Sequence, residues 1–194
     1  MKHMFMAVTA AAGLLAASTA GAVTVVGATH VQISSAIAWT QVAEVVATQY
    51  GTGINVAASA NGGVASAPDQ YSGVSGPTNA NDGNTAGNYY LSEIYHSANP
   101  FGTLNINFAP ATLSSLTIWG RTDCCSDRDL FNVSIYNRSN TLLYSGVIDA
   151  RNGSGTVSFG APGGVPEAAT WAMMIAGFGM VGATMRRRQA IATA

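Results

Sequence analysis

The residues best suited to chemistry gather in one stretch, Arg121-Thr122-Asp123-Cys124-Cys125-Ser126-Asp127-Arg128, which holds both cysteines of the protein. A guanidinium presents a planar fork of donors that can hydrogen-bond paired oxygens, and sugar hydroxyls are natural targets for it. The acids of this region could hold the guanidinium groups in place. The same residue types also form solvated salt-bridge clusters, which contribute little to stability. The side chains by themselves favour the solvated cluster, so the context of the stretch has to decide its function.

Adjacent cysteines are unusual, because a bond between them closes almost no chain loop and adds little entropic stabilisation. In an oxidising compartment we expect Cys124 and Cys125 to pair and to present a flat, polarisable sulfur patch. A redox-active pair more often has Cys-x-x-Cys spacing and a helix N-terminus that lowers a thiol pKa. Adjacent thiolates also have poor geometry for sharing a metal ion. A surface feature is therefore favoured over a redox or metal centre.

Sequence signatures of catalysis are missing: there is no G-x-S-x-G, no H-E-x-x-H and no phosphate-binding loop. Asp127 and Asp129 could in principle form the carboxylate pair of a glycoside hydrolase. That chemistry needs two carboxyl groups across a cleft with separated pKa values. Beside two arginines, both carboxylates should stay ionised. The sequence therefore predicts that the protein is not an enzyme.

The composition indicates a β-rich, loop-rich extracellular protein, since charged residues make up only 9% of the chain and 22 residues are glycine. Of the 8 basic residues, Lys2, Arg186, Arg187 and Arg188 lie at the ends, so the middle holds the remaining arginines against 9 acidic residues. An acidic middle without a basic patch makes nucleic acid an unexpected partner.

Residues 1–22 are predicted to be a secretory signal peptide. Lys2 and His3 give a short basic start, the apolar run Met4–Ala17 follows, and small residues end the segment at Ser18–Ala22. A buried helix is the alternative interpretation of this run. An opposite targeting signal at the other end of the chain favours the signal peptide.

Residues 23–160 are predicted to form one all-β domain, an antiparallel β-sandwich. Leu104, Ile106 and Phe108 alternate with asparagines, which places the apolar side chains on one face of a sheet. The stretch 59–88 is rich in Gly, Asn, Pro and Ser and is expected to be loop. Short strands are expected at residues 31–33, 39–47, 54–57, 103–108, 115–119, 130–136, 142–147 and 156–159.

A linker over residues 161–165 leads to a C-terminal hydrophobic helix. The uncharged run Ala168–Met185 is long enough to span a thin bilayer. The basic residues after it should remain cytoplasmic; they are Arg186, Arg187 and Arg188. Together with Pro166, Glu167 and Trp171, this run and its three arginines resemble the PEP-CTERM sorting signal of Gram-negative bacteria.

That resemblance covers residues 166–188, followed by a short tail at 189–194. It implies that an exosortase-type membrane protease cuts near Pro166-Glu167. The mature protein would then be exported to the cell surface or extracellular matrix, after transient membrane anchoring through the C-terminal transmembrane helix. A permanent membrane anchor is the alternative.

The order of residues from His96 to Arg128 resembles the sugar-binding signature of the F-type lectins (fucolectins). That family has a His, an Arg-x-Asp, a vicinal cystine and a second basic residue in the same order. The resemblance runs over about residues 55–136, with Asn55-Val56-Ala57 similar to the family's opening strand. Trp39–Val45 looks like the N-terminal strand of discoidin-type domains. These likenesses imply a discoidin-like, galactose-binding-like jelly-roll sandwich.

The resemblance also implies roles for individual side chains. His96, Arg121 and Arg128 would donate hydrogen bonds to fucose, and Asp123 would orient Arg121. The Cys124–Cys125 disulfide would pack on the sugar ring. The apolar wall for the C6 methyl group, a role suited to amphipathic aromatics, would consist of Tyr71, Tyr89 and Tyr90.

Asn79, Asp82 and Asn84 resemble the family's calcium loop, and their hard oxygen atoms suit Ca²⁺. The family also draws on a Cys-Glu pair near the end of the domain, which this sequence lacks. The alternative is that Asn-Asp-Gly-Asn forms an ordinary tight turn.

Two hypotheses follow. The first is an exported, surface-sorted, non-catalytic carbohydrate-binding protein, lectin-like and specific for fucose-type or galactose-type glycans. The second is a structural or protein-interaction component of the extracellular matrix or biofilm that binds no sugar. The two differ in whether His96, Arg121 and Arg128 converge on one open pocket.

Overall fold

The computed structural model describes residues 22–162 and 173–180. The predicted signal peptide therefore lies outside the described residues up to position 21, as do most of the linker and the tail. The same holds for the predicted sorting residues, which are Pro166, Glu167, Trp171, Arg186, Arg187 and Arg188. The cytoplasmic placement expected for Arg186, Arg187 and Arg188 thus stays a prediction.

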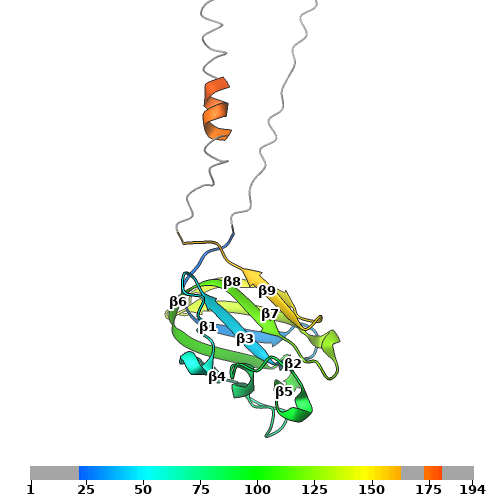
Figure 1. Ribbon diagram of the computed structural model, residues 1–194. Coiled ribbons are helices and arrows are strands. Elements are labelled where there is room, and N and C mark those ends of the chain that lie inside the picture. Colours follow the sequence, from blue (N-terminus) through cyan, green and yellow to red (C-terminus); the bar gives the residue numbers. More distant parts are fainter. Residues whose placement is uncertain (1–21, 163–172, 181–194) are drawn as a thin grey trace, which may run out of the picture.

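The described domain consists of β-strands joined by loops that carry short 3₁₀ helices (Figure 1). The 3₁₀ helices are η1 (Ser59–Asn61), η2 (Pro77–Ala80), η3 (Tyr89–Leu91) and η4 (Ser126–Arg128). The strands are β1 (Val25–Ser35), β2 (Trp39–Val42), β3 (Glu44–Gln49), β4 (Val64–Ser66), β5 (Tyr95–Pro100), β6 (Thr103–Trp119), β7 (Leu130–Asn137), β8 (Leu142–Asp149) and β9 (Ser154–Ser158).

All of the strand pairings are antiparallel, and two layers can be read from them. One layer has the strand order β8-β7-β1-β6-β4, and β6 contributes its first half to it. The second half of β6 pairs with β3 on one side and β9 on the other. The predicted all-β antiparallel sandwich is thus confirmed, whereas its jelly-roll, discoidin-like identity stays a prediction.

Strand β6 passes from one layer to the other at its middle. Pro110 has no backbone N–H to give to a ladder, and the facing strand β1 shows register shifts between Val25 and His30. Gly27 in that segment has φ +71°, a conformation that glycine adopts at little cost. An irregular partner strand and a proline together let one long strand serve both layers.

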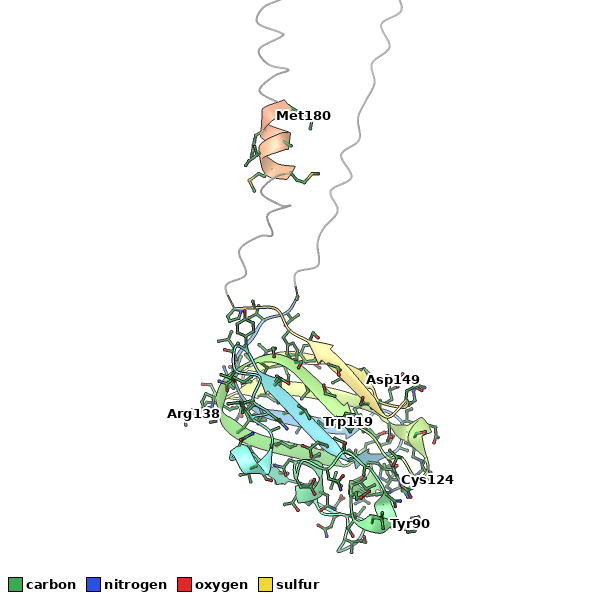
Figure 2. The ribbon with its side chains drawn as sticks, viewed as in Figure 1. Tyr90, Trp119, Cys124, Arg138, Asp149 and Met180 are labelled. Carbon is green, nitrogen blue, oxygen red and sulfur yellow. A yellow bond between two sulfur atoms is a disulfide. The ribbon has the colours of Figure 1, made fainter. Side chains whose placement is uncertain are left out.

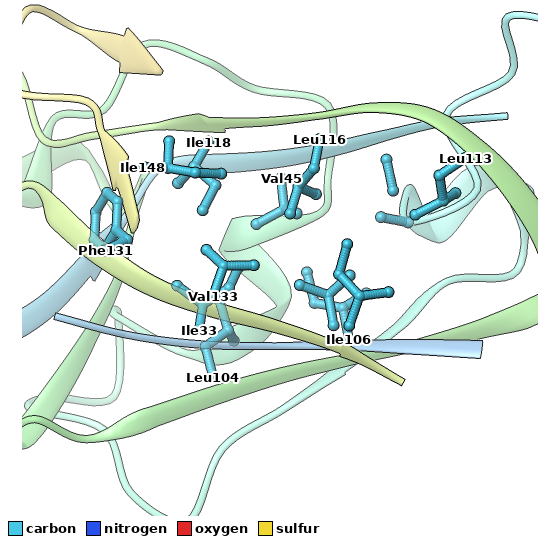
Figure 3. Close-up of a cluster of buried hydrophobic side chains, with 14 of the residues drawn as sticks. Ile33, Val45, Leu104, Ile106, Leu113, Leu116, Ile118, Phe131, Val133 and Ile148 are labelled. Carbon is cyan, nitrogen blue, oxygen red and sulfur yellow. The ribbon is translucent and has the colours of Figure 1, made fainter. Parts of the chain in front are cut away.

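The hydrophobic core lies between the layers (Figure 3). Ile33, Leu104 and Ile106 face it from one layer, and Leu116 and Ile118 face it from the other; all five are fully buried. Burying one such side chain contributes about 1.5–3 kcal/mol. The alternation of apolar and asparagine residues that predicted this face in 103–108 is therefore confirmed.

Several predicted strands differ from the observed ones, and the stretch 59–88, expected to be loop, contains strand β4. Residues 39–47 form two strands, β2 and β3, which belong to different sheets. Residues 103–108 and 115–119 are parts of the single strand β6. The expected strand at 54–57 was wrong, since only an isolated bridge joins Thr48 and Asn55. There the Asn55 Oδ1 accepts from the backbone N–H of Ala47 at 2.9 Å and of Ala57 at 3.1 Å, which fixes a turn.

The two ends of the described domain lie side by side, because the N–H of Gly160 donates to the carbonyl of Val23 at 2.9 Å. Figure 1 shows both ends leaving the sandwich at one end, while β2 and β5 lie at the other. A short helix occupies residues 173–180. Within the described ranges, no helix has the length and apolar character needed to cross a membrane. The predicted transmembrane run 168–185 is described only over this short helix.

Candidate functional site

An open pocket of about 360 Å³ lies at the end of the sandwich formed by β2, β5, η3 and the loop before β7. Figure 2 shows Tyr90 and Cys124 near each other at this end of the domain. Most of its lining consists of side chains chosen from the sequence. The lining residues are Trp39, Tyr71, Tyr89, Tyr90, His96, Arg121, Cys124 and Arg128.

Two segments hold the basic side chains at the pocket. Strand β5 carries His96, which pairs in register with Gln41 of β2. The loop between β6 and β7 carries Arg121, the cysteines and Arg128. This loop packs closely on the one before η3, where Gly87 has φ +76° and an added Cβ would lie 2.6 Å from the Gly120 carbonyl oxygen. Only glycine fits at position 87.

Arg121 and Asp123 form a two-pronged ion pair. The guanidinium donates from Nε to Oδ1 at 2.7 Å and from Nη2 to Oδ2 at 2.8 Å. Both side chains are nearly buried, with 7% and 11% of their surface exposed. The hydrogen bond from Arg121 lowers the pKa of Asp123, and the bond to Asp123 raises the pKa of Arg121. The predicted orienting contact between these two residues is present.

Two more hydrogen bonds fix this ion pair to the backbone around it. The N–H of Tyr89 donates to Asp123 Oδ1 at 3.2 Å, and the N–H of Arg121 donates to Asp129 Oδ2 at 2.7 Å. Asp129 is fully buried, and burial raises its pKa to about 8. The expectation that nearby arginines keep Asp129 ionised was therefore wrong, because desolvation outweighs their charge.

An aromatic wall stands beside Arg121. The ring of Tyr89 meets those of Tyr71 and Tyr90 edge-on, at centroid distances of 6.1 and 5.4 Å. The Arg121 Cζ lies 4.9 Å from the centroid of the Tyr89 ring, within the range of a cation–π contact. The Tyr89 hydroxyl donates to Ser72 Oγ at 3.2 Å, which fixes the ring. All three predicted tyrosines thus lie together at the pocket.

Trp39 also lines the pocket and was not predicted as a site residue. The Cζ of Arg128 lies 5.1 Å from the centroid of the Trp39 ring. The sequence placed Trp39 at the start of a strand but gave no sign that this strand ends beside the arginine loop. The separation of β2 from β3 into different sheets, which sequence periodicity does not reveal, is what brings Trp39 to the site.

His96 contributes its ring surface rather than a free donor. Its Nδ1 lies 2.8 Å from the carbonyl oxygen of Ser97, which can only accept, so Nδ1 carries the proton. Burial lowers the pKa of His96, which keeps the ring neutral. Nε2 then accepts from the Gln41 amide nitrogen at 2.9 Å. Both ring nitrogens have protein partners, while the ring lies 4.8 Å from that of Tyr71.

The predicted bond between Cys124 and Cys125 is present. Cys125 adopts a left-handed backbone conformation, φ +59°, at the start of η4. Cys124 is exposed and lines the pocket. The sulfur patch expected from the sequence therefore borders the same pocket as the arginines.

The loop proposed for calcium forms turns. The N–H of Asn84 donates to Asp82 Oδ1 at 2.8 Å, and Asn79 Nδ2 donates to the carbonyls of Val74 and Ile94 at 2.9 and 3.0 Å. No group of three or more His, Cys, Asp or Glu side chains that could hold a metal is found in the part of the chain that the structure describes.

One buried carboxylate nevertheless adjoins this loop. Glu44 Oε2 accepts from the N–H of Gly83 at 3.0 Å, whereas Oε1 is buried without a hydrogen-bond partner among the described residues. Burial raises the pKa of Glu44 to about 7. The unpaired Glu44 Oε1 is a hard oxygen atom of the type that Ca²⁺ prefers. Glu44 would supply an acid that sequence reasoning did not find.

Comparison with known proteins identifies one segment. A family model described as the PEP-CTERM protein-sorting motif matches residues 164–189, a range that includes Arg186, Arg187 and Arg188. This confirms the predicted sorting segment, and it indicates export with surface or membrane-associated sorting in bacteria, where exosortase recognises the motif. Searches of curated proteins and of solved structures return no match. The resemblance of residues 55–136 to F-type lectins stays a prediction.

Proposed function

We propose that the protein is a non-catalytic, lectin-like carbohydrate-binding protein, displayed at the surface or in the extracellular matrix of a Gram-negative bacterium, and that its ligands are fucose-type or galactose-type glycans. The proposal rests on one observation, which is that the site residues predicted from the sequence converge on a single pocket. Side chains chosen from the sequence, from Tyr71 to Arg128, line one open pocket together with Trp39.

The donors suit sugar hydroxyls. Arg121 uses two of its five N–H groups on Asp123, so three remain for a ligand. Arg128 forms no ion pair among the described residues and is held by its contact with the Trp39 ring instead. Both guanidinium groups are oriented before a ligand arrives, which lowers the entropic cost of binding.

The apolar surfaces suit a deoxy sugar. Tyr71, Tyr89 and Cys124 present aromatic and sulfur surface around the arginines. A C6 methyl group would pack against such a wall, while the ring hydroxyls would face the guanidinium groups. The pocket volume of about 360 Å³ is near the lower end for ligand sites, which suits one sugar ring.

His96 takes a different role from the donor role implied by the lectin resemblance. With Nδ1 on Ser97 and Nε2 on Gln41, its neutral ring would position Tyr71 and add surface to the pocket. Hydrogen bonding would fall to Arg121 and Arg128.

A structural calcium ion would be held by Asn79, Asp82 and Asn84 with the carboxylate of Glu44. The ion would supply positive charge next to the unpaired Glu44 Oε1. It would brace the loop that leads to η3 and the aromatic wall.

The location of the pocket suits display. The described domain begins and ends at one end of the sandwich, whereas β2 and β5 lie at the other end (Figure 1) and contribute Trp39 and His96 to the pocket. A C-terminal anchor would leave the pocket facing outward. One small pocket gives weak affinity, so useful binding would come from many displayed copies.

A matrix component without sugar binding is the second candidate. It is favoured by the Arg121–Asp123 ion pair, because a nearly buried and paired guanidinium also serves as an internal brace. In that case the loss of Arg121 would lower stability but change no ligand affinity.

A glycan array distinguishes the two candidates. Wild-type protein should bind fucosylated or galactosylated glycans, and Arg121→Ala should lose that binding. The matched control is Arg151→Ala, since Arg151 is exposed and pairs with Asp149 away from the pocket. Absence of wild-type binding to every such glycan would rule out the lectin proposal.

A further inference from the structure

A second hollow of about 410 Å³ lies away from the pocket described above. It is formed by the start of β1, the bend of β6 and the turn between β7 and β8. Its polar lining includes His30, Asn107, Asn137, Arg138 and Asn140, with Phe108 as the aromatic member. No part of the lectin resemblance assigns a role to these residues.

Arg138 is the distinctive residue of this hollow. Arg121 and Arg151 each pair with an aspartate, and Arg128 stacks on Trp39. Arg138 is exposed and forms no ion pair among the described residues. The lining contains no acidic side chain, although acids outnumber arginines in the domain. The hollow is therefore a local positive spot on an acidic domain.

Amides and an imidazole surround this cation. Asn137 Oδ1 accepts from the N–H groups of Ser139 and Thr141, each at 2.9 Å, so its NH₂ group is left for a ligand. His30 stacks on Tyr136 with ring centroids 4.7 Å apart and planes within 11°. Burial lowers the pKa of His30, so it offers neutral hydrogen bonding. Arg138 is then the one cation among the lining residues.

We propose that this hollow binds the anionic group of an acidic saccharide. The Arg138 guanidinium would pair with a carboxylate or sulfate through its planar fork. The asparagine amides and the neutral imidazole of His30 would hydrogen-bond neighbouring hydroxyls. A simple phosphate site would not need this ring of amides around a single cation.

The two sites lie at opposite ends of strand β7. Leu130 follows the arginine loop of the first pocket, and Asn137 lines the second hollow. Figure 2 likewise shows Arg138 on the far side of the domain from Cys124 and Tyr90. Eight strand residues span on the order of 25 Å. One domain could then join an acidic polysaccharide to a second glycan, as a matrix cross-link would require.

Retention on immobilised hyaluronate, an anionic polysaccharide without galactose or fucose units, tests the proposal, with neutral dextran as the reference matrix. Purified full-length protein should be retained on hyaluronate, and about 0.5 M salt should weaken this retention because it screens charge. Arg138→Gln should lower the affinity about tenfold, as expected for the loss of charge-assisted hydrogen bonds. Arg151→Gln removes the same charge at another exposed site and should leave affinity unchanged.

The other arms separate the alternatives. Dextran sulfate in place of hyaluronate tells a sulfate ligand from a carboxylate ligand, and retention by either one supports the site. Arg121→Ala should not change retention, because Arg121 lies outside this hollow. The result for this site is therefore independent of the lectin proposal. The proposal is overturned if wild-type protein is retained by neither polymer. It is equally overturned if Arg138→Gln and Arg151→Gln behave alike.

Discussion

Arg121 and Asp123 face each other through two hydrogen bonds, Nε to Oδ1 at 2.7 Å and Nη2 to Oδ2 at 2.8 Å. Arg121 and Asp123 are separated by a single residue in the chain, and their ion pair holds the arginine loop in place at the pocket. Asp123 also accepts from the N–H of Tyr89, so the same carboxylate ties the arginine to the aromatic wall.

Asp123→Asn should destabilise the domain by about 1–3 kcal/mol, because a nearly buried guanidinium loses its charged partner. Asp149→Asn is the matched control. It breaks an ion pair whose side chains are 48% and 47% exposed, so its effect should stay below about 0.5–1 kcal/mol. Urea unfolding measures both variants. Equal losses of unfolding free energy would contradict the bracing role of Asp123.

Trp39→Ala should weaken glycan binding several-fold, because it removes the ring on which Arg128 rests and one side of the pocket. Tyr50→Ala is the control, since Tyr50 is an exposed aromatic outside the pocket lining. Fluorescence or calorimetric titration measures the affinities. If Trp39→Ala binds as tightly as Tyr50→Ala, the pocket does not extend to β2.

Stability should fall as the pH rises through the neutral range. Burial raises the pKa of Asp129 to about 8, well above the 3.8 of an unfolded aspartate, so the folded state binds the extra proton. This contribution is fully present below pH 3.8 and is lost as pH rises through about 8. Asp129→Asn cannot ionise and should show a smaller fall in unfolding free energy between about pH 4 and 8.5. An identical pH profile for the variant would contradict the raised pKa.

Calcium should raise the melting temperature, because an ion that binds only the folded state stabilises it. Glu44→Gln should abolish the increase, since it removes the buried, unpaired carboxylate oxygen. Glu93→Gln makes the same change at a carboxylate that caps the N–H of Asn88 and should respond like wild type. The calcium proposal fails if millimolar calcium leaves the wild-type melting temperature unchanged.

Local patterns in the sequence predicted much of the fold. Apolar side chains that alternate with asparagines identified the buried face of β6, because strand periodicity depends only on neighbouring residues. The stretch 54–57 has a strand-like composition, yet the Asn55 side chain bonds backbone N–H groups on both sides and fixes a turn. Side-chain bonds of that kind depend on tertiary contacts, and periodicity carries no record of them.

In the candidate site, too, the local features could be predicted from the sequence and the long-range contacts could not. The residues from Arg121 to Arg128 lie close together in the chain, so their types and spacing could be read together. Trp39 reaches the pocket through the pairing of β2 with β5. The same pairing brings the Gln41 amide to its hydrogen bond with His96 Nε2. Such long-range pairing depends on the whole fold. The sequence therefore contains no sign that both ring nitrogens of His96 have partners within the protein.

The most direct test of the central claim is a calorimetric titration of the protein with L-fucose and with D-galactose. Wild-type protein should bind at least one of them saturably, with a Kd on the order of 1 mM, as a small ligand in an open pocket allows. Arg121→Ala should remove this binding, and Arg151→Ala should retain it. Absence of saturable binding by wild type, or unchanged binding by Arg121→Ala, would contradict a sugar pocket built around Arg121.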